Sequence, residues 1–202
     1  TMTRCFPIWK NTIDSLTPNK TPSQILELGD HLSEIFRQTG NTGRGQGEVS
    51  SGGTAWESLI CWYLNLCLIG RRTVVIRHNK ALIPTPINDA ITVNYHNFAS
   101  NTESDLIAIT YPDKGDYHCD IEELSLTDAR GRMIPVRNTR GSYNLKKIMD
   151  ALCERDFHEL EIHIVQCKTN WNDNAQIPML WDAVYAAKNF RNGVSVGPFR
   201  SD

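Results

Sequence analysis

Hydrophobic residues recur at the spacing of an α-helix in three stretches of the chain. The first runs from Thr21 to Thr39, begins with Thr-Pro-Ser and ends before Gly40. The second, Ala55–Ile69, has Thr54 as its cap and is apolar on nearly all sides, which predicts a buried helix. The third, Leu145–Cys153, carries its apolar side chains on one face.

Runs of β-branched and apolar residues predict strands between and after these helices. A hairpin is predicted where Glu123–Thr127 and Met133–Arg137 flank the turn-forming sequence Asp128-Ala-Arg-Gly. A further helix is predicted over Asn174–Lys188, and no internal repeat is visible. The predicted strands are Thr73–Arg77, Ala90–Tyr95, Glu103–Tyr111, Leu160–Lys168 and Val194–Val196.

Length and composition favour one globular domain. The chain has 202 residues, of which 40% are hydrophobic and 22% are charged, so it can bury a substantial core. These values exclude a disordered chain, a collagen-like fibre and a small disulfide-stabilised scaffold. Strands interspersed with helices predict an α/β or α+β domain.

Charge and cysteine usage narrow the partners and the compartment. Lys and Arg total 21 and Asp and Glu total 23, so the net charge of −2 excludes a basic coat for non-specific nucleic-acid binding but allows a local basic cleft. Six scattered cysteines without a CxxC pair predict reduced thiols. No apolar run reaches the roughly 18 residues of a membrane helix, and no signal-peptide pattern is visible. We therefore expect a soluble, cytoplasmic protein without a membrane partner.

Three polar residues stand at the ends of two apolar strands. Gln166 and Lys168 end the predicted strand Leu160–Lys168 and, two positions apart, share one face. Asp105 lies at the entry of the predicted strand Glu103–Tyr111. If these strands are neighbours, an acid, an amide oxygen and an ammonium group meet at one sheet edge, where buried polar groups are costly without a function. This set suits metal-assisted phosphodiester hydrolysis, with Mg²⁺ on the carboxylate and a lysine stabilising charge on the phosphate.

Two further groups are candidates for the same site. The backbone carbonyl of Cys167, between Gln166 and Lys168, is a candidate metal ligand. Glu57 is the only charged residue in the apolar helix Ala55–Ile69, so its carboxylate needs a partner, a metal or a wet cleft. The alternative for Glu57 is an exposed position at the helix N-terminus, where the helix dipole favours an acid.

The order of these elements resembles the PD-(D/E)XK nuclease superfamily, in a variant with Gln-x-Lys in place of Glu-x-Lys. The resemblance covers roughly residues 54–198 and rests on the helix with Glu57, the strand with Asp105, and the strand with Gln166-Cys-Lys168 that is followed by a helix and a strand. It implies an α/β, restriction-endonuclease-like fold, with a mixed central sheet flanked by helices. It also implies that Asp105 and Gln166 bind the metal, that Lys168 is the catalytic lysine and that Glu57 is the helix acid.

The chain departs from the family pattern at several points. Ser104 and not a proline precedes Asp105, Gln166 is a neutral and weaker ligand than Glu, and a long insertion separates the two strands. The acid is therefore either Asp105 or one of three residues closer to the lysine strand, which are Asp120, Glu122 and Glu123.

The predicted organisation is an N-terminal helical segment with a Gly-rich loop (residues 1–53) and a nuclease core (residues 54–202) with an insertion at about residues 112–158. Arginines of the insertion and amides after Lys168 are candidate DNA contacts. The same arginines also suit a solvated charged face, and one of the amides suits a helix cap. The candidates are Arg130, Arg132, Arg140, Asn170, Asn172 and Asn174.

The sequence therefore predicts a Mg²⁺-dependent DNA endonuclease, more narrowly a type II restriction endonuclease that acts on double-stranded DNA as a homodimer. One alternative is a non-specific or structure-specific repair or phage nuclease. Another is a catalytically inactive DNA- or protein-binding module on the same fold, which the neutral Gln166 keeps open.

Overall fold

The computed structural model describes residues 2–39, 49–79, 82–95, 98–101, 104–128, 130–168, 194–196 and 199–201. The described part combines helices with strands, so the predicted α/β class is confirmed. Contacts divide the chain into a first unit, Thr1–Arg71 with Gln166–Asn172, and a second unit, Arg72–Val165 with Asp173–Asp202. The domain boundary predicted at residue 54 stays a prediction.

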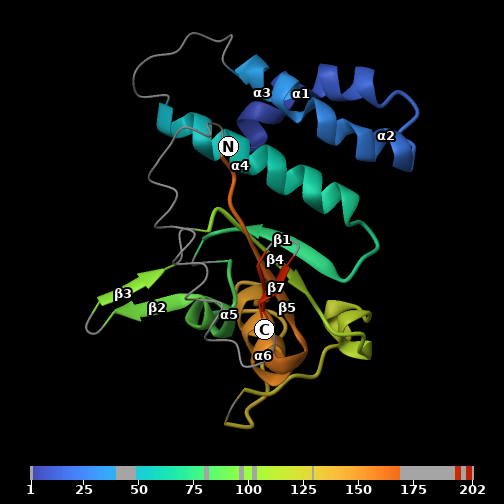
Figure 1. Cartoon of the computed structure of the whole chain (residues 1–202). Coiled ribbons are helices and arrows are strands. Elements are labelled where there is room, and N and C mark those ends of the chain that lie inside the picture. Colours follow the sequence, from blue (N-terminus) through green and yellow to red (C-terminus); the bar gives the residue numbers. More distant parts are fainter. Residues whose placement is uncertain are drawn as a thin grey trace. The chain divides into compact units, whose positions relative to one another are not determined.

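Helices dominate the first unit, and Figure 1 shows α1, α2 and α3 along one side of α4. The helix α2 starts at the predicted Thr-Pro-Ser sequence, where the Thr21 hydroxyl accepts a hydrogen bond from the Gln24 backbone N–H and caps the helix. The stretch predicted as one helix over Thr21–Thr39 is divided by a short 3₁₀ turn. The bounds are α1 (Met2–Leu16), α2 (Pro22–Glu27), η1 (Leu28–His31), α3 (Leu32–Arg37) and α4 (Val49–Cys67).

A fully buried tryptophan belongs to the hydrophobic core of the first unit. Trp9 of α1 is fully buried, and its indole N–H donates to the Thr39 hydroxyl at 3.0 Å. The sequence analysis misses α1, whose apolar pattern is interrupted by Pro7. Side chains at helical spacing nonetheless build one face of α1, which packs with buried residues of the other helices. The buried cluster consists of Cys5, Trp9, Ile13, Leu28, Leu32, Ile35, Ala55 and Leu59.

Helix α4 differs from its prediction in two ways. It begins at Val49, so Thr54 lies inside the helix and the predicted cap is wrong. Among residues 52–67 of α4, whose burial the structure describes, Ala55, Ser58 and Leu59 are buried, whereas residues 60–67 are half-buried. The core around Trp9 takes one face of the helix, which explains why burial is restricted to one stripe. The Gly-rich loop at residues 40–48 lies outside the described residues.

A three-stranded antiparallel sheet forms the centre of the second unit, in the order β1 (Thr73–Arg77), β4 (Leu106–Thr110), β5 (Glu161–Val165). The described sheet is antiparallel throughout, and the predicted restriction-endonuclease-like arrangement stays a prediction. Strand β5 ends before Gln166, whereas the sequence predicts a strand as far as Lys168. The last pair of the β4–β5 ladder is Leu106–Val165, so Gln166, Cys167 and Lys168 lie beyond the paired strand.

Other elements of the second unit fall close to their predicted positions. The predicted strand Ala90–Tyr95 is shorter, because Pro84 and Pro86 begin a helix that includes Ala90. The predicted hairpin is reduced to an isolated bridge between Thr127 and Met133. The bounds are α5 (Thr85–Ala90), β2 (Thr92–Tyr95), β3 (Phe98–Asn101), η4 (Gly115–Tyr117), η5 (Ile121–Glu123), α6 (Leu145–Arg155), η6 (Phe157–Glu159), β6 (Val194–Val196) and β7 (Phe199–Ser201).

Helices α5 and α6 cover one face of the sheet in the second unit (Figure 1). Ile107 and Ile109 of β4 point to this face and are fully buried. Ile87 of α5 and Cys153 of α6 meet them there, also fully buried. The alternation predicted for β5 is confirmed, because Ile162 and Ile164 pack into the same cluster.

A buried carboxylate at the end of α6 forms hydrogen bonds with the segment that follows β4. Asp156 is only 4% exposed and accepts hydrogen bonds from Lys114 (2.7 Å), Tyr117 (2.9 Å) and Arg155 (2.6 Å). The hydrogen bonds from Arg155 hold the pKa of Asp156 well below its usual range against the opposing effect of burial, and those from Lys114 and Tyr117 lower it further. The folded state therefore keeps this carboxylate charged.

We expect Asp156→Asn to lower the free energy of unfolding by about 2–3 kcal/mol, because three donors lose a charged acceptor. Urea denaturation at pH 7 measures this loss. Glu159→Gln is the matched control, since Glu159 contacts the same Lys114 but is 54% exposed, and its loss should stay below about 1 kcal/mol. Equal losses from the two substitutions would contradict the role assigned to Asp156.

The pH dependence gives a second readout of Asp156. Its lowered pKa stabilises the folded state above the ordinary aspartate pKa of about 3.9, and this stabilisation disappears as the pH falls below that value. The difference in unfolding free energy between wild type and Asp156→Asn should therefore narrow between about pH 4 and pH 2. A difference that is constant over this range would show that the charge of Asp156 contributes nothing.

Candidate functional site

Two predicted site residues leave the sheet at the same end. Leu106 of β4 pairs with Val165 of β5, and this is the last pair of their ladder. Asp105 directly precedes Leu106, and Gln166 directly follows Val165. The strands that Asp105 and Gln166 adjoin are neighbours in the sheet, which is the condition on which the sequence argument for a shared site depends.

A third residue, which the sequence analysis did not select, belongs to this end of the sheet. His78 directly follows β1, and its backbone N–H donates to the carbonyl oxygen of Asp105 at 3.0 Å. This bond continues the β1–β4 ladder by one residue beyond the pair Arg77–Leu106. The signal in the sequence is a histidine directly after a β-branched strand, but its relation to Asp105 depends on the register.

The imidazole of His78 is held by the residue before Asp105. Its Nδ1 lies 2.7 Å from the hydroxyl oxygen and 3.0 Å from the carbonyl oxygen of Ser104, which is only 5% exposed. A carbonyl oxygen can only accept, so this contact places the proton on Nδ1. His78 thus fixes the Ser104–Asp105 segment through both its main chain and its side chain.

The remaining predicted site residues belong to the first unit by their contacts. Gln166, Cys167 and Lys168 follow β5 as irregular, half-buried chain. Glu57 lies inside α4, well after its start at Val49, so the alternative of an acid at the helix N-terminus is wrong. Glu57 is half-buried, as its position in the apolar stretch of the helix suggests.

The three alternative acids follow the opposite end of β4. Asp120 caps the short helix η5 by accepting a hydrogen bond from the Glu122 backbone N–H at 3.1 Å. Glu122 forms an ion pair with Arg137, and Glu123 is exposed. In the second unit, Asp105 is therefore the acid beside the last pair of β4 and β5.

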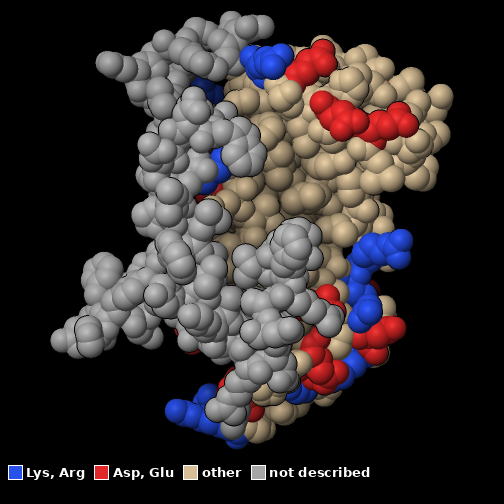
Figure 2. Space-filling view, viewed as in Figure 1, with Lys and Arg blue, Asp and Glu red and all other residues tan. Residues whose placement is uncertain are grey.

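The candidate DNA contacts fall into three groups. Arg132 is ion-paired with Asp128 at 2.7 Å. Arg130 and Arg140 are exposed at the ends of two turns. Figure 2 shows Lys and Arg side chains interspersed with Asp and Glu over the lower part of the visible face instead of gathered in one basic patch. The candidates Asn170, Asn172 and Asn174 lie outside the described residues, as does the predicted helix Asn174–Lys188.

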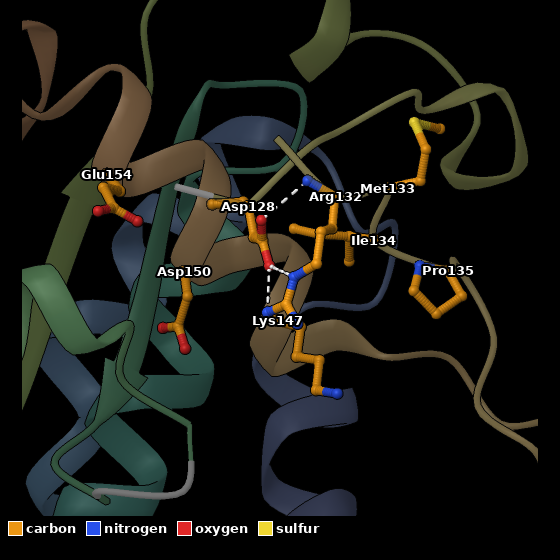
Figure 3. Close-up of a pocket in the computed structure, with 9 residues that line it drawn as sticks. Asp128, Arg132, Met133, Ile134, Pro135, Lys147, Asp150 and Glu154 are labelled. Carbon is orange, nitrogen blue, oxygen red and sulfur yellow. Dashed lines mark hydrogen bonds and ion pairs between the residues drawn. The ribbon is translucent and has the colours of Figure 1, made fainter. Parts of the chain in front are cut away.

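The second unit also contains an open groove of about 450 Å³, which lies between α6 and the segment from Asp128 to Pro135 (Figure 3). Figure 3 shows Arg132 reaching toward Asp128, while Asp150 and Glu154 project from α6. Neither Asp105 nor His78 lines this groove, and its charges are of both signs. The lining residues are Asp128, Arg132, Met133, Ile134, Pro135, Lys147, Asp150, Ala151 and Glu154.

Comparison with family models, with curated proteins and with solved structures finds no match to this chain. Within the described ranges, no three His, Cys, Asp or Glu residues are grouped so that they alone could hold a metal ion. No helix in the described part is both long enough and apolar enough to cross a membrane.

We expect His78→Leu to lower the free energy of unfolding by about 1–3 kcal/mol, because the buried Ser104 hydroxyl loses its partner. His78→Asn should retain most of this stability, since an asparagine amide can donate from the position of Nδ1. A double-mutant cycle with Ser104→Ala, measured by urea denaturation, isolates the contact. Strictly additive effects of His78→Leu and Ser104→Ala would show that the imidazole does not hold Ser104.

Proposed function

We propose that this chain is a Mg²⁺-dependent DNA endonuclease whose site lies at the end of the sheet where β4 begins and β5 ends. The observation that carries the proposal is the pairing of β4 with β5. Leu106 and Val165 are the last residues to pair, and Asp105 and Gln166 are their respective neighbours in the sequence. The order α4, β1, β4, β5 supports a restriction-endonuclease-like core, since Glu57 lies on the helix that precedes the first strand.

The donor set at this site fits a hard cation. The Asp105 carboxylate, the Gln166 amide oxygen and the Cys167 carbonyl oxygen would hold Mg²⁺, which prefers oxygen ligands. When bound, the ion would stabilise negative charge on the phosphate and lower the pKa of a water molecule. Because only one of these ligands is charged, the phosphate of the DNA would have to supply part of the binding.

The chain's own residues have separate roles in this proposal. Lys168 would stabilise the negative charge that develops on the scissile phosphate, the role that the resemblance to the nuclease superfamily implies. Glu57 would supply the second acid that the same resemblance implies. His78 is a positioning residue, because its backbone N–H donates to the main-chain carbonyl of Asp105 and its imidazole contacts Ser104.

The narrower proposal is a type II restriction endonuclease that acts as a homodimer. One site in each chain cuts one strand, so a double-strand cut uses two copies related by symmetry. Discrete fragments from long duplex DNA would support sequence-specific cutting, whereas a smear or selective nicking would favour the non-specific or structure-specific nuclease. Cleavage in neither form would favour an inactive binding module, for which the neutral Gln166 is the supporting feature.

We expect Asp105→Asn and Lys168→Ala each to reduce the rate of DNA cleavage by at least about 100-fold, because each removes a group that stabilises charge at the phosphate. The measurement is single-turnover cleavage of long duplex DNA with Mg²⁺, and with EDTA as the metal-free reference. Asp105→Asn keeps the main-chain carbonyl to which the His78 N–H donates, and urea denaturation checks that the variant is folded.

Asp120→Asn is the matched control for this experiment. It removes an acid from the opposite end of β4 and should leave the cleavage rate within about twofold of wild type, since exposed substitutions are mostly neutral. Full activity of Asp105→Asn, or cleavage that EDTA does not stop, would overturn the site. Loss of activity in Asp120→Asn alone would move the acid to the other end of the sheet.

A further inference from the structure

Two consecutive turns of the second unit share one pattern of hydrogen bonds. In the first, Asp128 Oδ1 accepts hydrogen bonds from the backbone N–H groups of Arg130 and Arg132, each at 2.9 Å. The Asp128 N–H donates in return to the Arg132 carbonyl at 2.8 Å. Gly131 has a φ of +74°, which favours glycine at this position.

The second turn repeats this arrangement with an asparagine. Asn138 Oδ1 accepts from the N–H groups of Arg140 (2.9 Å) and Ser142 (3.1 Å). The Asn138 N–H donates to the Ser142 carbonyl at 2.8 Å. Gly141 has a φ of +79°. Each turn therefore carries one arginine at the same place, directly before the glycine.

Both turns are anchored at their base. Leu126 and Ile134 flank the first turn and are joined by a backbone hydrogen bond of 2.9 Å. Val136 and Asn144 flank the second and are joined in the same way at 2.8 Å. The apolar residues at these bases pack on α6, so the tips project from a fixed support. The cluster contains Leu126, Ile134, Val136, Ile148 and Leu152.

The arginines of these turns divide into two kinds. Within the described part of the chain, the guanidinium groups of Arg130 and Arg140 take part in no hydrogen bond or ion pair, and both side chains are exposed. Arg132 and Arg137, from the same two turns, are each held by a neighbouring carboxylate. Each tip thus presents one uncompensated positive charge.

We propose that Arg130 and Arg140 form a two-point contact with the phosphate backbone of double-stranded DNA. A repeated turn with one unpaired guanidinium group suits a ligand whose anionic group also repeats, as phosphates do along a strand. The anchored tips reduce the ordering cost of binding. The choice of DNA among polyanions rests on the proposed nuclease function, whereas the anionic, repeating character of the ligand rests on the turns alone.

The test is the salt dependence of DNA binding. Fluorescence anisotropy with a short duplex, in EDTA so that no cleavage occurs, gives the slope of log K against log salt concentration. We expect the magnitude of this slope to fall by about 0.9 in Arg140→Gln and by about 1.8 in Arg130→Gln/Arg140→Gln. Because both side chains are exposed and neither guanidinium group forms a hydrogen bond or ion pair with the described residues, both variants should unfold at the wild-type urea concentration.

Arg137→Gln is the matched control, since it removes the same charge from the same turn. Its guanidinium group is already paired with Glu122 and lies over the ring of Tyr143. We expect it to leave the slope unchanged. An equal change in Arg137→Gln and Arg140→Gln would show that net charge alone matters and would overturn the proposal.

The outcomes separate this contact from the proposed catalytic function. Asp105→Asn should retain the wild-type slope while it loses cleavage. An altered slope in the Arg130→Gln/Arg140→Gln variant without any Mg²⁺-dependent cleavage in wild type would support the contact and contradict the nuclease. Mg²⁺-dependent cleavage by wild type, together with an unaltered slope in the Arg130→Gln/Arg140→Gln variant, would support the nuclease and contradict the contact. Binding of heparin or RNA by wild type, with no binding of duplex DNA, would overturn the contact as proposed.

Discussion

Strand β4 is hydrogen-bonded to β1 along one edge and to β5 along the other, and Leu106, Ile107 and Ile109 in it are fully buried. A buried strand has no water available for its backbone groups, so both neighbours are needed to satisfy them. Once the register is fixed, the residues at the two ends of β4 are fixed too. A shift of one residue would turn the isoleucines away from α5 and α6.

The two ends of β4 have different chemistry. At the exit, the backbone N–H of Tyr111 donates to the Arg72 carbonyl, and the Tyr111 ring stacks on Tyr117 with centroids 5.1 Å apart. Tyr117 in turn donates to the buried Asp156. At the entry stand the small polar Ser104 and the acidic Asp105. Stacked rings and a buried carboxylate thus surround the exit of β4, whereas a serine and an aspartate stand at its entry.

The sequence was sufficient wherever one pattern determined one element. The alternation in β5 and the one-sided pattern of α6 predicted both elements and their buried faces, because burial on one face selects that pattern. The sequence pattern was insufficient where contacts with other elements determine the bounds of a helix or strand. The alternation in β5 does not reveal that its pairing with β4 stops at Leu106–Val165, and α1 forms in spite of Pro7 because its apolar face packs around Trp9. Likewise Asp105 was predicted, whereas the role of His78 follows only from the register.

The repeated turns show a further limit of pattern reading. Only the arginine and the glycine are identical between Asp128-Ala-Arg-Gly and Asn138-Thr-Arg-Gly, so the amino-acid sequence does not indicate a repeat. The repeat is conformational, since aspartate and asparagine offer the same acceptor oxygen and glycine supplies the same positive φ.

The same turns show why total charge is a poor guide to this surface. A net charge of −2 argues against a basic coat, and acidic side chains do pair with several of the insertion's arginines. Pairing cancels charge locally, however, so the field near the surface depends on the arginines that remain unpaired. A chain that is slightly acidic overall can therefore still present cations to a polyanion, provided that they stand at exposed tips where their own carboxylates do not reach them.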